Sequence, residues 1–137
     1  MLYQHGVGLA FLATVRPDGN PRLHPMCPII TDDGMFAFII PSPKERDLER
    51  SGGYALHSFP CPTNEDAFLV TGHATLVADD TRRTGLAKLF VEERAAIGVA
   101  PPASDDALFE FDIASALLTR TTGHGDPAPD HRVWHAG

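Results

Sequence analysis

Residues 8–40 read GLAFLATVRPDGNPRLHPMCPIITDDGMFAFII, and this stretch decides the fold class. It holds three mainly apolar runs with the length of β-strands, at Gly8–Val15, Pro21–Thr31 and Met35–Ile40. Short turn sequences, RPDGN and DDG, separate the runs, and their proline and glycine residues favour tight turns. Parallel strands would need a crossover helix between each pair, so the sequence predicts an antiparallel meander.

A short helix is expected directly after this meander. Ser42 suits the N-cap, Pro43 the first helical position and Glu45 the third, where its side chain can complete a capping box. Leu48 is the main apolar residue of the helix and is expected to face the core. The two glycines at 52–53 are expected to end the helix.

Three further strands and a second helix complete the expected pattern. Gly72 lies at the centre of the longest strand and predicts a bulge or bend of the kind found in barrels. The second helix is expected to carry one apolar face, made by Leu86, Leu89, Phe90 and Ile97. The strands are expected at Tyr54–Phe59, Ala67–Asp79 and Ala107–Thr121, the helix at Asp80–Gly98, and a flexible tail at residues 123–137.

Six strands and two short helices in 137 residues predict a single domain, residues 1–137, with a mainly β fold. A chain of this length can bury a core of its own without disulfides. The first three strands have only turns between them, which favours a small Greek-key-like antiparallel β-barrel over an alternating βαβ architecture.

The chain is acidic, with 11 lysine and arginine residues against 18 aspartate and glutamate residues and a formal net charge of −7. This balance disfavours nucleic acid and anionic membranes as partners. No apolar run approaches the ~20 residues of a membrane span, and the first ten residues do not resemble a signal peptide. We therefore expect a cytoplasmic protein. Lys44 and Lys88 are the only lysines, so each is a local exception to the acidic character of the chain.

The two cysteines, Cys27 and Cys61, lie far apart and form no CxxC pair or other zinc-ligand spacing. His57 lies four residues before Cys61, but prolines on both sides of this cysteine exclude a helix there. We expect two free thiols in a reducing compartment and no metal site.

The stretch PRLHPMCP, residues 21–28, is the most informative for function. Its prolines cannot donate hydrogen bonds to a neighbouring strand, so the strand is interrupted or has an open side. An arginine and a histidine beside unpaired backbone can receive a polar planar ligand, and the alternative is a solvated face of an edge strand. Alternate residues of a strand share a face, so the two expected sets are Arg22, His24 and Met26, and Leu23, Pro25 and Cys27.

The start of the first helix is a candidate anion site. A helix N-terminus presents free backbone N–H groups and a partial positive charge, and Ser42 and Lys44 add a hydroxyl and an ammonium group. Such a set suits a phosphate. The alternative is an ordinary helix cap with Lys44 in solvent, although Ser42 can cap the helix while Lys44 binds an anion.

Together, these features resemble the flavin-binding split-barrel family related to pyridoxamine 5′-phosphate oxidase. The resemblance covers Leu9–Val77 through the segments ATVRPDGNPRLHPM, DDGMFAFIIPSPKERDL, YALH and FLVTGHATLV. The later segment FEFDIASALL and the tryptophan-containing end of the chain are also similar. The resemblance implies a split-barrel fold and a homodimer that binds FMN in clefts between its subunits.

The resemblance also implies roles for individual residues. The strand from Arg22 to Met26 would run along the isoalloxazine ring, and Arg22 matches an arginine that contacts the cofactor. Ser42 and Lys44 match an S-x-K element that holds the FMN phosphate, with Leu48 packed behind it. The implied cofactor-binding set is Arg22, His24, Pro25, Met26, Ser42, Lys44, Leu48 and Trp134, the last closing the cleft, and no catalytic residue is assigned.

Departures from the family pattern argue against pyridoxamine-phosphate oxidation itself. Cys27 stands where those oxidases have a lysine that grips the substrate phosphate, and Ala67 stands where they have a glutamine. Arg132 and His135 are not spaced like the arginine–histidine pair of the oxidase C-terminus. The chain also starts almost at the first expected strand, without the helix that precedes it in relatives, so we expect a more open cleft.

Three functions are compatible with the sequence. The first is an FMN-dependent oxidoreductase that acts on a small organic molecule, with redox chemistry supplied by the flavin. The second is a deazaflavin (F420)-dependent reductase, which two lysines make less favourable because the longer tail of that cofactor needs a more basic groove. The third is a non-catalytic flavin- or haem-binding protein, in which His24 or His57 is a candidate haem ligand.

Overall fold

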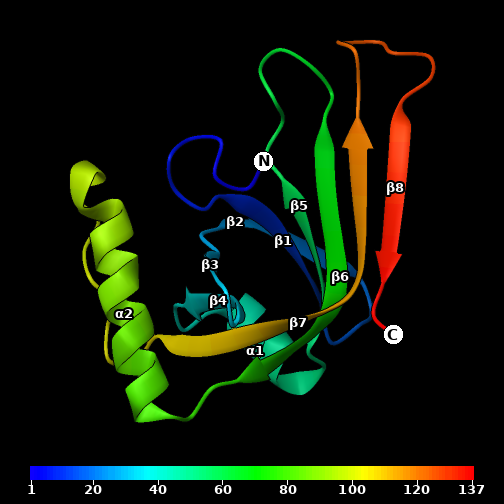
Figure 1. The fold of residues 1–137 in the computed structure, drawn as a ribbon. Helices are drawn as coiled ribbons and strands as arrows, with labels where there is room; N and C mark the ends of the chain where they lie inside the picture. The colour runs from blue at the N-terminus through cyan, green and yellow to red at the C-terminus, as the bar shows by residue number, and fades with distance from the viewer.

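The computed structural model describes residues 1–137 and shows a curled antiparallel sheet with two α-helices (Figure 1). The mainly β, antiparallel barrel class is confirmed, with eight strands rather than the six expected. The strands are β1 (Ala10–Val15), β2 (Pro21–Met26), β3 (Ile29–Thr31), β4 (Gly34–Ile39), β5 (Gly53–Ser58), β6 (Ala67–Leu76), β7 (Ala107–Arg120) and β8 (Asp130–His135). The helices are α1 (Pro43–Arg50), α2 (Asp80–Arg94) and a short 3-10 turn, η1 (Ala95–Ile97).

The predicted three-strand meander is wrong, because the chain makes two separate hairpins, β1–β2 and β3–β4. The sheet order is β2-β1-β5-β6-β7-β4-β3, so the hairpins lie at opposite ends of the sheet. The expected strand Pro21–Thr31 breaks at residues 27–28, where Pro28 cannot donate a ladder hydrogen bond. Only these two residues join the two ends of the sheet, which is why the sheet curls into a barrel.

The two longest strands, β6 and β7, carry a bulge where the sequence predicted one. The register shifts between Thr71 and Gly72, opposite residues 113–115 of β7. A Cβ atom at Gly72 would lie 1.8 Å from the carbonyl oxygen of Asp112, closer than any side chain allows. Gly72 therefore permits the close approach of two backbones, and the bulge bends the pair so that its far end projects from the barrel with β8 (Figure 1).

Replacing Gly72 with alanine is expected to lower the free energy of unfolding by about 1–2 kcal/mol, because a backbone must move to admit the methyl group. Gly85 is the matched control, since it lies in α2 with no atom within 4 Å of a Cβ built on it. Gly85→Ala is expected to stabilise the protein by about 0.5–1 kcal/mol. Urea unfolding measures both shifts, and equal effects of the two substitutions would contradict this account.

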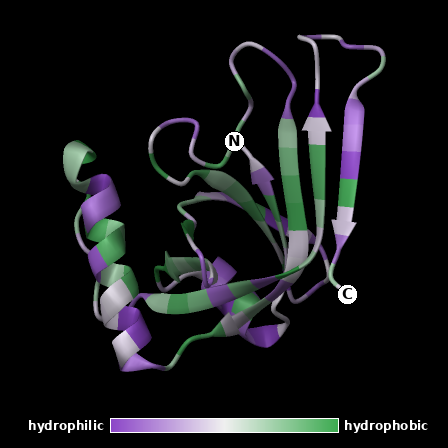
Figure 2. Cartoon of the chain, viewed as in Figure 1, coloured by the Kyte–Doolittle hydropathy of each residue, from purple (hydrophilic) through white to green (hydrophobic).

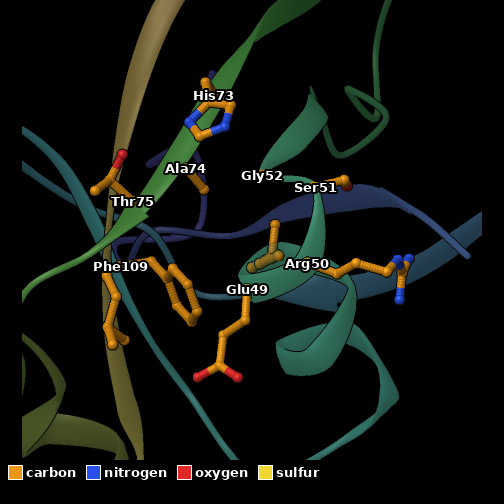
Figure 3. A pocket seen from close by; sticks show the side chains of 10 residues that line it. Glu49, Arg50, Ser51, Gly52, His73, Ala74, Thr75 and Phe109 are labelled. Carbon is orange, nitrogen blue, oxygen red and sulfur yellow. The ribbon is translucent and has the colours of Figure 1, made fainter. Parts of the chain in front are cut away.

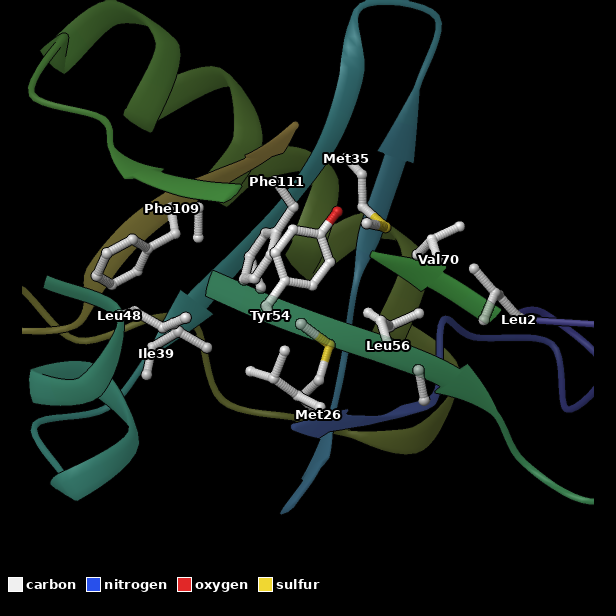
Figure 4. Packing of buried hydrophobic residues seen from close by; sticks show 14 residues of the cluster. Leu2, Met26, Met35, Ile39, Leu48, Tyr54, Leu56, Val70, Phe109 and Phe111 are labelled. Atoms are coloured by element: carbon white, nitrogen blue, oxygen red, sulfur yellow. The ribbon is translucent and has the colours of Figure 1, made fainter. Parts of the chain in front are cut away.

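Apolar side chains fill the inside of the barrel, and Figure 4 shows this cluster. Leu48 of α1 is 2% exposed within it, as the sequence predicted. Tyr54 meets Phe111 edge-on, with ring centroids 4.9 Å apart. Leu2 is buried in the same cluster, so the turns of residues 1–9 pack against the barrel. A second, smaller cluster attaches α2 to the sheet through Ile29, Phe36, Leu86 and Leu108.

The apolar face predicted for the second helix is only partly correct. Leu86, Leu89 and Phe90 pack against the sheet. Ile97 is 62% exposed, because the α-helix ends at Arg94 and the following 3-10 turn changes the spacing. Figure 2 shows hydrophilic and hydrophobic bands alternating along α2. Neither helix combines the length and apolar character that a membrane-spanning segment requires.

The C-terminal tail contains a strand, β8, that the sequence did not predict. β8 pairs with the end of β7, with Trp134 opposite Ala116 and Val133 opposite Leu117. All six side chains of β8 are exposed. Backbone pairing rather than burial therefore holds this strand, and the hydropathy pattern contained no signal for it.

Candidate functional site

The helix α1 begins where the sequence predicted. Ser42 is the N-cap, because its Oγ accepts a hydrogen bond from the backbone N–H of Glu45 at 3.4 Å. The same Oγ donates to the carbonyl oxygen of Ile40 at 2.7 Å. The capping box is half formed, since the Glu45 carboxylate makes no hydrogen bond back to Ser42. Ser42 thus caps the helix, and Lys44 supplies the positive side-chain charge at the helix start.

A cavity of about 250 Å³ lies beside this helix start, and we call it the Lys44 cavity. Pro25 and Met26 of β2, followed by Cys27, form one part of its lining together with Lys44. The cavity therefore joins three residues of the predicted cofactor-binding set in a mainly apolar space with one ammonium group. The rest of the lining comes from β4 and the residue after it, from α2 and from the stretch before β7, and includes Phe38, Ile40, Phe90, residues 100–102 and Asp106.

Lys44 and Arg22 lie close enough to His24 to influence its charge. Burial lowers the pKa of Lys44, with Cys27 as a smaller opposing influence. Burial also lowers the pKa of His24, and the positive charges of Lys44 and Arg22 lower it further, against an opposing effect of Asp47. Two cations, Lys44 and Arg22, thus lie near His24 in a chain whose net charge is −7. Such a local excess of positive charge suits an anionic ligand.

Asp47 lies beside this site and was not predicted from the sequence. Its side chain is 2% exposed and accepts hydrogen bonds from Thr14 Oγ1 at 2.8 Å, Arg22 Nε at 2.8 Å and Arg50 Nη2 at 3.2 Å. Burial raises the pKa of Asp47, but these hydrogen bonds outweigh it and hold the pKa below its ordinary value. The one signal in the sequence was an acidic residue directly before Leu48, on a helix otherwise rich in exposed charges.

Asp47 holds the Arg22 side chain but leaves part of its guanidinium group without a hydrogen-bond partner. Its Nε is committed to Asp47, whereas its two Nη atoms make no hydrogen bond within the chain. The side chain is 24% exposed. Burial alternates along β2, so the predicted division of this strand into two faces is confirmed. Arg22 can therefore donate hydrogen bonds to an anion through Nη while Asp47 fixes its orientation.

Five residues of the predicted set do not line the Lys44 cavity, namely Arg22, His24, Ser42, Leu48 and Trp134. Leu48 packs in the core behind α1. Trp134 lies on β8, and β1, β5, β6 and β7 separate β8 from β2 in the sheet. At about 4.8 Å between neighbouring strands, this is more than roughly 20 Å along the sheet. Trp134 therefore does not contribute to the Lys44 cavity of its own chain.

Four other cavities, all somewhat larger, offer no unpaired arginine or lysine. One of about 280 Å³ is lined by Arg82, which pairs with Glu110 at 3.3 Å. Figure 3 shows one of about 400 Å³ between the end of α1 and β6, lined by Arg50, His73 and Phe109 among others. Arg50 is committed to Asp47 and to the carbonyl oxygen of Val15. Another cavity, of about 480 Å³ near the β3–β4 turn, carries two aspartates and no basic residue. The Lys44 cavity is thus the best suited to an anionic ligand.

Both cysteines are free thiols, but their surroundings differ. Cys27 lines the Lys44 cavity. Cys61 lies in the loop before β6, where its Sγ donates to the carbonyl oxygen of Asp66 at 3.6 Å. No group of three or more His, Cys, Asp or Glu side chains is arranged to hold a metal ion.

No family model and no curated protein sequence matches the chain, but solved structures do. A pyridoxamine 5′-phosphate oxidase-related, FMN-binding protein from Nostoc punctiforme PCC 73102 is 15% identical with a TM-score of 0.70, over 94% of this chain and 81% of that chain. General stress protein 26 from Bacillus anthracis str. Sterne is 17% identical with a TM-score of 0.68, over 96% and 92%. HutZ, a haem storage protein from Vibrio cholerae, is 18% identical with a TM-score of 0.64, over 77% and 80%. The chain therefore has the split-barrel fold of the pyridoxamine 5′-phosphate oxidase-related, FMN-binding proteins, as the sequence resemblance predicted.

Proposed function

We propose that the chain binds FMN in the Lys44 cavity and acts as a flavin-dependent oxidoreductase on a small organic molecule. One observation carries this proposal: a single cavity joins a mainly apolar lining to Lys44, whose charge, like that of Arg22, reaches His24. FMN, when bound, supplies hydride or electron transfer through its ring. The residues of the chain bind and orient it.

The groups in and around the cavity fit the two parts of FMN. A phosphate needs a cation and hydrogen-bond donors in fixed positions, and Lys44, the Nη atoms of Arg22 and the start of α1 offer these. A flat, largely apolar ring needs apolar and aromatic contacts, and Pro25, Met26 and Phe38 offer these. We therefore assign the phosphate to the Lys44 side and the ring to the side of β2 and β4.

We further propose a homodimer in which Trp134 of one copy closes the Lys44 cavity of the other. Val133 and Trp134 are 62% and 53% exposed on the part of the sheet that projects from the barrel, which leaves apolar surface for a second copy (Figure 1). Light scattering after size-exclusion chromatography is expected to give twice the 14.8 kDa mass of one chain. A stable monomer would remove this part of the proposal.

Binding of FMN is expected to raise the pKa of His24. In the free protein, burial and then the charges of Lys44 and Arg22 hold this pKa below its ordinary value. A phosphate dianion beside the same two cations offsets their effect. NMR titration of the His24 ring measures the pKa with and without saturating FMN. Riboflavin, which lacks the phosphate, is the control, and an equal shift with riboflavin would contradict the placement of the phosphate.

Haem is the second candidate ligand. A haem storage protein shares this fold, and the lowered pKa of His24 favours the neutral imidazole, the form that ligates iron. Absorbance spectra of the protein mixed with FMN, with F420 and with haem separate the candidates. Saturable perturbation of the flavin bands supports the proposal. A Soret shift without flavin binding transfers the assignment to haem, and binding of F420 alone transfers it to a deazaflavin.

A further inference from the structure

Residues 99–106, VAPPASDD, connect η1 to β7 and form part of the lining of the Lys44 cavity. We call this stretch the connecting segment. Residues 100–102 and Asp106 contribute to the lining. The segment contains no helix or strand, and the Asp106 carboxylate closes it into a turn by accepting a hydrogen bond from the backbone N–H of Ala103 at 2.9 Å.

Arg83 of α2 ties the connecting segment to the rest of the protein. Its Nη1 donates to the carbonyl oxygen of Asp106 at 2.6 Å, and its Nη2 donates to the carbonyl oxygen of Ala103 at 2.9 Å. No other hydrogen bond joins the connecting segment to another element. One planar guanidinium group thus donates hydrogen bonds to the carbonyl groups at both ends of the turn, a fork geometry that the ammonium group of a lysine lacks.

The same guanidinium group also contacts the aromatic side of the cavity. Its Cζ lies 5.2 Å from the centroid of the Phe38 ring. Phe38 lines the cavity and meets Phe90, another lining residue, edge-on with centroids 6.0 Å apart. Arg83 itself does not line the cavity. Arg83 therefore links the connecting segment to the Phe38 ring from outside the cavity.

We propose that Arg83 is a positioning residue that holds the connecting segment as an apolar wall of the Lys44 cavity, and that this wall accepts an uncharged planar ring. Phe38, Phe90 and two prolines offer flat apolar surfaces, and the one charged side chain of the wall, Asp106, already has a partner in Ala103. A charged ring would lose hydration against this wall without gaining a partner. Naming the flavin ring as the occupant rests on the proposed function.

Flavin binding by Arg83→Ala tests this proposal, with Arg82→Ala as the matched control. Arg82 stacks on Phe36 at the same 5.2 Å and pairs with Glu110 at 3.3 Å, but it makes no hydrogen bond to the connecting segment. Arg83→Ala and Arg83→Lys are expected to weaken binding of FMN and of riboflavin alike, about tenfold, because the wall contacts the ring. Arg82→Ala is expected to change either affinity by less than about twofold. Equal effects of the two alanine substitutions overturn the positioning role and leave the proposed function in place.

A second readout does not depend on flavin. Cys27 lines the cavity and Cys61 lies outside it, so the rates at which a maleimide modifies the two thiols report how well the wall covers the cavity. In Arg83→Ala, modification of Cys27 is expected to be several-fold faster than in the wild type, with Cys61 unchanged as the internal control for folding. An unchanged rate at Cys27 overturns the proposal. If the wild type binds no flavin and Arg83→Ala still exposes Cys27, the proposed function fails and the positioning role stands.

Discussion

Lys44→Ala is expected to weaken FMN binding about 10- to 100-fold, because it removes a charged hydrogen-bond donor to the phosphate. Lys44 is the one ammonium group in the cavity lining, and its partial burial leaves its charge less screened than that of a surface lysine. Lys88→Ala is the matched control, since Lys88 is the only other lysine and is 77% exposed beside Glu92. Fluorescence titration with FMN measures both affinities.

Riboflavin separates the role of the charge from any general damage to the cavity. It carries the same ring as FMN without the phosphate, so Lys44→Ala is expected to leave its affinity within about twofold of the wild type. An equal loss of FMN affinity in the Lys44 and Lys88 variants would contradict the placement of the phosphate. So would an equal loss of FMN and riboflavin affinity in Lys44→Ala.

Asp47→Ala is expected to lower the free energy of unfolding by about 2–4 kcal/mol. The substitution removes the shared acceptor of Thr14, Arg22 and Arg50, and it leaves the 1% exposed Thr14 hydroxyl without a partner. The two arginines are 24% and 39% exposed, so water replaces part of the hydrogen bonding that they lose. Urea unfolding measures the change. Glu49→Ala, an exposed position on the same helix, is the control, and an equal shift in both variants would contradict a structural role for the Asp47 network.

The same carboxylate makes stability depend on pH. Burial raises the pKa of Asp47, but hydrogen bonds from Arg22, Thr14 and Arg50 bring it below the ordinary value of 3.8. A carboxylate whose pKa is depressed in the folded state stabilises the protein above its unfolded-state pKa, and this contribution is lost as pH falls through the folded-state pKa. The difference in stability between the wild type and Asp47→Asn is therefore expected to be constant near pH 7 and to shrink below about pH 3.8. A difference that stays constant down to pH 2 would show that the carboxylate does not titrate in this way.

Local geometry explains which parts of the fold were predictable from the sequence. The RPDGN turn between β1 and β2, Ser42 and Pro43 before α1, and Gly72 within β6 each impose a backbone conformation that needs no remote partner. The structure confirms a turn, a helix start and a bulge at these positions.

Strand pairing depends on remote partners and was predicted less well. Whether Pro21–Thr31 forms one strand or two is decided by the partner of each half, and β2 pairs with β1 whereas β3 pairs with β4. The strand β8 was missed because its exposed side chains leave no periodic pattern. Each of these features follows from the closure of the barrel rather than from the segment itself.

The residues of the candidate site fall into the same two groups, those with a local signal in the sequence and those that depend on remote partners. Arg22, His24 and Lys44 were identified because their residue types and spacing point to an anion, and the structure brings Arg22 and Lys44 near His24. Asp47 and Arg83 were missed because their partners are distant in the sequence. Thr14 is 33 residues from Asp47, and the carbonyl partners of Arg83 are 20 and 23 residues away. Such contacts depend on how α1 and α2 dock on the sheet.

The central claim is that the Lys44 cavity binds FMN, and a fluorescence titration of FMN with the purified wild-type chain tests it most directly. We predict saturable binding of one FMN per chain, with a dissociation constant in roughly the micromolar range or below. Lys44→Ala should shift the curve to higher concentration, and Lys88→Ala should superimpose on the wild type. A flavin signal that stays unchanged up to roughly 100 µM protein would contradict the claim.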